Sequence, residues 1–297
     1  MSESRFTWSA NRALLFAALI LLFLGVAAVY ADSARIEAAR ANDTATILGN
    51  GADNRTELPA SGTVTYRMYL PVVARQFACV PIPDASYGTV AIMSAPTNPP
   101  AAVHPDLNLS LRGYVRTTGT LGLVTYGGPS DPGAPQLYTL FGDNRTPTFS
   151  AVYQVYDWDW VHNRRGLPIA DPLVTLAGMV VAKDEILHVP ASGYDIGMRP
   201  TGYEVMVLYV DNARVTLIYT LEDNVIWGYT IHIENICIDP NLLSLYQTMN
   251  TAGRTRLPAL YAGQGIGRAI TTEIGVAVRD CGSFMDPRSR MDWWQGR

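Results

Sequence analysis

Apolar and polar positions first single out one long uncharged run near the start of the chain. Residues 13–31 read ALLFAALILLFLGVAAVYA, and Arg5 and Arg12 precede them. A helix of this length nearly spans a hydrocarbon core of about 30 Å, and basic residues before it favour a cytoplasmic start. The pattern predicts a segment, residues 1–31, that sends the rest of the chain out of the cytoplasm. It is either an uncleaved membrane anchor or a signal peptide cut before Asp32.

Residues 32–78 carry no periodic apolar pattern over most of their length. Residues 32–62 are small and polar, which predicts a flexible spacer that cannot bury enough apolar area to become ordered. Thr63–Ala74 then reads TVTYRMYLPVVA. Its Tyr-Leu-Pro-Val-Val core resembles short segments of uncharacterised secreted proteins of filamentous bacteria; the alternative is a β-strand with an edge proline.

From Cys79 onward, short apolar runs alternate with Gly, Pro, Asn and Asp, a pattern typical of strands and turns. One helix is expected over Pro240–Thr251, with Asp239 as its N-cap. The sequence thus predicts a mainly β fold of antiparallel sheets with one short α-helix. We divide it near Asp171–Pro172 into a loop-rich β region, 79–172, and a β domain, 173–297. The expected strands are Gly88–Met93, Gly122–Tyr126, Thr148–Tyr156, Leu173–Val181, Tyr203–Val210, Arg214–Thr220, Trp227–Ile233 and Glu273–Arg279.

Charge and cysteine content narrow the possible functions. The chain has 22 basic and 26 acidic residues, a net charge of −4 and no basic cluster, so a nucleic-acid partner is not expected. Its three cysteines, Cys79, Cys237 and Cys281, lack the spacing of a structural zinc site. Outside the cytoplasm one pair can oxidise. We expect Cys79–Cys281, which would join the start of the domain to its end, with Cys237 a buried small hydrophobe.

Several glycine-containing pieces of the C-terminal half follow one another in a familiar order. They are ASGYDIG at 191–197, TGYEVMV at 201–207, GYTIHI at 228–233, AGQGIG at 262–267, TEIGVAVR at 272–279 and FMDP at 284–287. In order and spacing they resemble the lysostaphin-like zinc endopeptidases (peptidase family M23, the LytM domain). The likeness covers about a hundred residues and is weak at single positions. The alternative is a set of ordinary glycine turns between strands.

The resemblance implies a β-scaffold that has lost its metal. The family's zinc is held by two histidines and an aspartate. Here Asp195 matches the aspartate, but Ala191 stands at the first histidine, and Glu273 and Gly275 stand at the His-x-His positions. Because a zinc site needs three converging ligands, no cofactor is expected. The remaining cleft would bind peptidoglycan-like or protein ligands.

A replacement set of ligands can be drawn from neighbouring strands. The period of two places His232 and Glu234 on one strand face, and Asp195 and Glu273 would complete an oxygen and nitrogen set. The alternative is a polar strand face whose histidine is hydrogen-bonded to its neighbours.

An aromatic stripe supplies the second candidate. In YQVYDWDWVH, 153–162, alternation puts Tyr156, Trp158 and Trp160 on one face and Asp157 and Asp159 on the other. Indole faces beside carboxylates suit sugar rings. The alternative is that the aromatic residues are core and the aspartates are solvated.

The sequence therefore predicts an extracytoplasmic protein, secreted or anchored to the membrane through its N-terminal helix. Its expected role is non-catalytic binding or scaffolding at the cell envelope, with cell-wall glycan or peptide as partner. A carbohydrate-binding or carbohydrate-active module that uses the YDWDW stripe is the first alternative. A structural surface protein is the second.

Overall fold

The computed structural model describes residues 79–297 except 198 and 199. The expected anchor or signal helix, the spacer and the Tyr-Leu-Pro-Val-Val strand lie outside these residues. Within the described part of the chain, no helix is long and apolar enough to cross a membrane. The described residues belong to one compact unit. The expectation of a mainly β fold with antiparallel sheets is confirmed.

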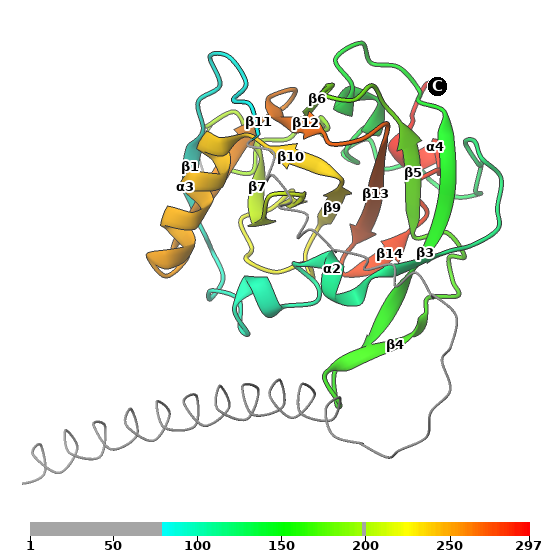
Figure 1. Ribbon diagram of the computed structural model, residues 1–297, viewed down its shortest axis with the longest axis horizontal. Helices are drawn as coiled ribbons and strands as arrows, with labels where there is room; N and C mark the ends of the chain where they lie inside the picture. The colour runs from blue at the N-terminus through cyan, green and yellow to red at the C-terminus, as the bar shows by residue number, and fades with distance from the viewer. Residues whose placement is uncertain (1–78, 198–199) are drawn as a thin grey trace, which may run out of the picture. The chain divides into compact units, whose positions relative to one another are not determined.

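One large antiparallel sheet of eleven strands makes up most of the fold (Figure 1). Two short strands lie off its main path: β14 (Ser283–Met285) pairs with β13, and β4 (Arg164–Pro168) pairs with β3. The main path runs in the order β1 (Gly88–Ala91), β11 (Arg256–Tyr261), β7 (Tyr203–Val210), β8 (Arg214–Ile218), β9 (Tyr229–Glu234), β13 (Glu273–Asp280), β5 (Leu176–Val180), β3 (Phe149–Asp159) and β2 (Tyr114–Arg116).

A second sheet of three strands packs beside the first, and short helices fill the remaining sides (Figure 1). Its order is β10 (Ile236–Ile238), β12 (Gly265–Ala269) and β6 (Ile186–His188). The helical elements are the 3-10 turns Ala101–Val103 and Leu137–Leu140 and the α-helices α2 (Leu109–Arg112), α3 (Pro240–Thr251) and α4 (Arg290–Trp293).

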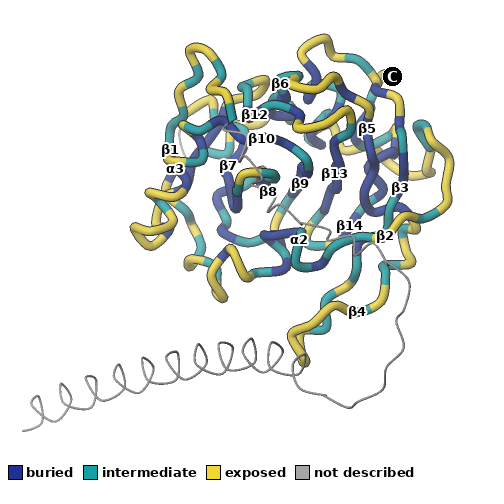
Figure 2. Tube along the Cα trace, in the orientation of Figure 1, coloured by how far each residue is buried: buried dark blue, intermediate teal, exposed yellow. Residues whose placement is uncertain are grey.

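The hydrophobic core lies between the two sheets, and strand alternation explains which side chains enter it. Ile231 and Ile233 of β9 and Val276 of β13 are completely buried on the core side. The same strands send Thr230, His232 and Glu234 to the opposite face, as a period of two requires. Figure 2 shows this buried centre along β9, β13 and β5. Along β9 the large sheet is therefore buried on both faces. One face is apolar, and the other, here called the polar face, carries Thr230, His232 and Glu234 beside a small apolar cluster.

Helix α3 has the bounds and the cap that the sequence predicts. The Asp239 carboxylate accepts a hydrogen bond from the backbone N–H of Asn241, and Pro240 opens the helix where no N–H is needed. Leu242 and Tyr246, one turn apart, are its buried residues. Asp239 also accepts from the backbone N–H of Ile82 at 2.6 Å, so the cap also holds the incoming chain.

Some expected elements differ from the structure. Gly122–Tyr126 is not a strand; only Val124 makes an isolated bridge, to Ser289. The three-stranded sheet and the short helices α2 and α4 were not expected. The chain on either side of Asp171–Pro172 shares one sheet, because β3 pairs with β5.

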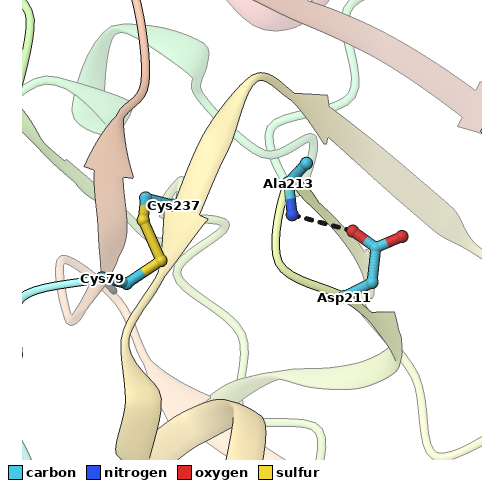
Figure 3. The surroundings of a disulfide bond; sticks show 4 residues. All are labelled: Cys79, Asp211, Ala213 and Cys237. Atoms are coloured by element: carbon cyan, nitrogen blue, oxygen red, sulfur yellow. Dashed lines mark hydrogen bonds between the residues drawn. A yellow bond between two sulfur atoms is a disulfide. The ribbon is translucent and has the colours of Figure 1, made fainter. Parts of the chain in front are cut away.

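The disulfide joins Cys79 to Cys237, with the two Cα atoms 5.5 Å apart (Figure 3). The expected Cys79–Cys281 bridge is therefore wrong, and Cys281 is an exposed free thiol. Cys281 lies in the turn between β13 and β14, whereas Cys237 lies on β10, beside the cap that binds Ile82. The bridge consequently fixes the start of the described chain to the small sheet and not to the C-terminal region.

Candidate functional site

The turn around Asp195 is closed by its own hydrogen bonds. The Asp195 carboxylate accepts from the backbone N–H groups of Gly197, Thr201 and Gly202 and from the Thr201 hydroxyl. These hydrogen bonds lower the pKa of Asp195 to about 2, so the side chain is a carboxylate at any physiological pH. Asp195 is thus occupied in shaping the loop between β6 and β7.

Asp195 lies far from Glu273, one of the residues that were expected to share its site. The strand register places the start of β7, next to this turn, level with the end of β13 at Arg279. Glu273 begins β13, about 20 Å away along the strand at about 3.3 Å per residue. Asp195 does not join His232, Glu234 and Glu273 in one cluster. Among the described residues, no group of three or more His, Cys, Asp or Glu side chains is placed to hold a metal ion.

A pocket of about 500 Å³ adjoins the Asp195 turn. Trp227, in the loop before β9, is 61% exposed and forms one wall. The other lining residues are Met93, Ile196, Gly197, Tyr219, Thr220, Leu221 and Glu222. An exposed indole in a concave surface is costly to leave in water, and its flat apolar face can stack on a planar or ring-shaped ligand.

The pocket holds one carboxylate that is free to accept hydrogen bonds. In the described part of the chain, the Glu222 side chain makes no hydrogen bond or ion pair. The backbone N–H of Glu222 donates a hydrogen bond to the Thr220 hydroxyl oxygen. Thr220 in turn donates to the Trp227 carbonyl oxygen at 3.4 Å, which ties the two loop ends together. The pocket therefore combines an aromatic wall with an unused acceptor.

His232 lies on the polar face of the large sheet, sealed from solvent. Its Nδ1 is 2.9 Å from the Thr216 hydroxyl, which itself donates to the carbonyl oxygen of Leu107. This network makes Nδ1 the protonated nitrogen and leaves Nε2 buried with no partner among the described residues. The ring stacks on Phe284 at 6.2 Å. His232 is a buried neutral imidazole.

Burial, reinforced by the nearby Arg279 guanidinium, lowers the pKa of His232 to about 3. Because the unfolded chain binds the proton near pH 6.5, the stabilising effect is present above that pH and is lost as the pH falls towards 3. We expect the free energy of unfolding to fall by about 2 kcal/mol between pH 6.5 and pH 5 from this group. Urea unfolding at both pH values measures it.

His232→Phe is the matched variant for this prediction, because its ring can keep the contact with Phe284. The difference between the pH dependence of the two proteins isolates residue 232, since every other titrating group is present in both. An identical fall in stability on acidification in the variant would contradict the assignment.

Glu234 and Glu273 share the polar face with His232 but have separate partners. The Arg214 Nε donates to both carboxylate oxygens of Glu234 at 3.1 Å. Glu273 accepts from the hydroxyls of Ser150 at 2.5 Å and Tyr153 at 3.1 Å. Burial raises the pKa of Glu234, and the Arg214 charge opposes that rise. Each acid is thus satisfied within the sheet.

The YDWDW segment forms a β-hairpin, β3–β4, that projects from the body (Figure 1). Both aspartates of the segment are hydrogen-bonded to other residues of the chain. Asp157 accepts from Arg112 at 3.4 Å, and Asp159 accepts from the backbone N–H of His162 and pairs with its ring at 2.7 Å. Trp160 is 52% exposed and contacts the His104 ring edge to face.

The aromatic stripe of this hairpin is broken. The strand register shifts between Tyr156 and Trp158, so the expected even alternation does not continue through the segment. Tyr156 and Trp158 are half-buried, and the Trp158 indole nitrogen is buried with no partner among the described residues. The hairpin thus offers Trp160 as its one exposed aromatic ring rather than a flat platform of three.

Comparisons with known proteins give no match: no family model, curated protein or solved structure is significantly similar to this chain. The likeness to the lysostaphin-like peptidases stays a hypothesis.

Sequence reasoning missed Trp227 and Glu222 as site residues. The sequence pattern predicts Trp227 as the first residue of a strand, whereas β9 begins at Tyr229. The available signal was the apolar pair Ile226–Trp227 directly before Gly228, a turn residue with a positive φ of 72°. This signal does not show that Met93 and Ile196, from distant parts of the chain, complete the pocket around Trp227.

Proposed function

We propose that this chain is an exported, non-catalytic module of the cell envelope that binds a glycan in the Trp227 pocket. The export part of the proposal is supported by the uncharged run at residues 13–31. The one observation that carries the glycan part is the exposed indole of Trp227 beside the unpartnered Glu222 carboxylate. An indole face packs against the C–H face of a sugar, and a carboxylate accepts its hydroxyls.

A binding role is supported over a hydrolytic one by the state of the candidate acids. Asp195, Glu234 and Glu273 are each bound to donors of the protein itself. Glycoside hydrolysis needs two carboxyl groups facing each other across a cleft, about 5–10 Å apart. Glu222 is the one acid among the residues that line the Trp227 pocket. If the peptidase likeness is real, Ala191 and Gly275 also leave two zinc-ligand positions without a ligand.

Trp227→Ala is expected to weaken glycan binding at least tenfold, because the stacking surface disappears while the strands stay intact. The measurement is isothermal titration calorimetry of the full chain with chitotetraose, a soluble β-1,4-linked N-acetylglucosamine oligomer, because the heat signal does not depend on the tryptophan that each variant removes. Glu222→Gln should give a smaller loss, since a neutral amide oxygen is a weaker acceptor than a carboxylate.

Trp160→Ala is the matched control, because it removes another exposed indole from the hairpin outside this pocket. Binding that survives in Trp227→Ala but disappears in Trp160→Ala would replace our proposal with the YDWDW alternative. No response of the unmodified chain to chitotetraose or to other cell-wall and plant oligosaccharides would remove the glycan function altogether.

A further inference from the structure

A second pocket, of about 840 Å³, lies at the disulfide and shares no lining residue with the Trp227 pocket. Cys79 and Cys237 form part of its wall, and Figure 3 shows the disulfide together with the β7–β8 turn at Asp211 and Ala213. Its apolar lining is Val80, Ile238, Pro240, Leu243, Ala269 and Ile270, and its polar lining is Lys183, Asp184, Asn212 and Arg268. A pocket of this size with a mainly apolar lining and a few polar groups is typical of small-molecule sites.

Arg268 gives the pocket an anchor for an anion. In β12 it lies directly opposite Cys237 of β10, so both side chains leave the same face of the small sheet. Its Nη1 donates to the carbonyl oxygen of Asp184 at 3.2 Å, which fixes the guanidinium. Its Nε is buried and has no hydrogen-bond partner among the described residues. A buried guanidinium donor without an acceptor is costly, and a bound carboxylate or phosphate would satisfy it.

The Arg268 charge has no counter-ion within the described part of the chain. Asp184, which also lines the pocket, contacts Arg268 through its carbonyl oxygen. None of the ion pairs among the described residues includes Arg268 or Asp184. The guanidinium therefore keeps its charge available for an anionic group.

We propose that this pocket binds an amphiphile with one apolar chain and an anionic head, the head on Arg268 and the chain against Leu243 and Ile270. The apolar lining matches a hydrocarbon chain, whose burial yields about 0.8 kcal/mol per methylene. An extended peptide fits less well, because its amide groups would lose water against mostly apolar walls. The proposal is independent of glycan binding at Trp227, since the two pockets share no lining residue.

Equilibrium dialysis of radiolabelled decanoate against the full chain in phosphatidylcholine nanodiscs tests the proposal, with empty discs as background. We expect saturable binding of one decanoate per chain. Arg268→Gln should weaken it about 10- to 100-fold, because a charge-assisted hydrogen bond is lost while the side-chain stem is kept. Competition by decyl phosphate and by decanol separates a carboxylate head, a phosphate head and simple apolar binding.

Arg256→Gln is the control, because Arg256 is exposed on β11 and bonds to Thr89 outside this pocket. Unchanged binding in this variant together with loss in Arg268→Gln supports the proposal, whichever anionic head competes better. Equal binding by Arg268→Gln and the unmodified chain, decanol competing as well as decanoate, or no saturable binding would each overturn it. None of these results depends on whether chitotetraose binds at Trp227.

Discussion

Replacing Cys79 with serine is expected to lower the free energy of unfolding by about 5 kcal/mol at 25 °C. The bridge to Cys237 closes a loop with a sequence separation of 158 residues. Without the bridge the unfolded chain gains conformational entropy, and this gain is larger for a longer loop. The same cut releases the segment that carries Ile82, whose N–H binds the cap of α3 at Asp239. Guanidinium unfolding of the full chain, with and without a reductant, measures the effect.

Cys281→Ser is the matched control, because Cys281 is exposed and unbridged. It should leave the unfolding midpoint unchanged and should keep the full sensitivity to reductant. The Cys79→Ser protein, in contrast, should show no further loss when reductant is added. An equally large loss of stability in Cys281→Ser and in Cys79→Ser would instead restore the Cys79–Cys281 pairing that the sequence alone favoured.

The long strands and the long helix were predictable because their patterns are strong over many residues. Tyr203–Val210 is a run of eight apolar and aromatic residues apart from Glu204, and β7 has these bounds. Helix α3 follows from one N-cap, one proline and apolar residues at helical spacing. Local signals of this kind do not depend on distant parts of the chain.

The small sheet could not be read from sequence, because its strands are short and one contains glycines. The sequence predicts that Gly265 and Gly267 lie in a turn, whereas the structure places both in β12. A side chain at Gly267 would collide with the carbonyl oxygen of Cys237, so glycine is needed there for close strand approach. The requirement for glycine arises only from the pairing with β10, which is distant in sequence. The disulfide was assigned wrongly for the same reason, because Cys237 lies on β10 of this unpredicted sheet.

For the candidate site, the sequence predicted which side chains share a strand face but not which distant residues bind them. Alternation correctly put His232 and Glu234 on one face, but the partner that binds Glu234 is Arg214 of the neighbouring strand. Whether an acid is available to a ligand depends on such long-range partners. The sequence therefore overestimated Asp195 and Glu273, which the protein itself uses, and passed over Glu222.

The buried pair Asp223–Arg254 is expected to be the second most costly interaction to break. Arg254 Nε and Nη2 bind the two Asp223 oxygens at 2.9 and 2.5 Å, and the Thr97 N–H also donates to this carboxylate. Asp223 is 1% exposed and Arg254 5%. Arg254 further donates to the Leu208 carbonyl oxygen and the Tyr246 hydroxyl, so it links β7 to α3.

Asp223→Ala should therefore destabilise the protein by about 3–5 kcal/mol, because it leaves the Arg254 charge buried without a counter-ion. Chemical unfolding at pH 7 measures the loss. Asp143→Ala is the control: its pair with Arg145 at 2.9 Å is exposed, so solvent replaces it and the midpoint should hardly move. Adding Arg254→Met to Asp223→Leu should recover part of the stability, since a packed apolar pair removes the stranded charge. If Asp223→Ala cost no more than Asp143→Ala, the pair would have to be accessible to water, and the packing of α3 on β7 would need another explanation.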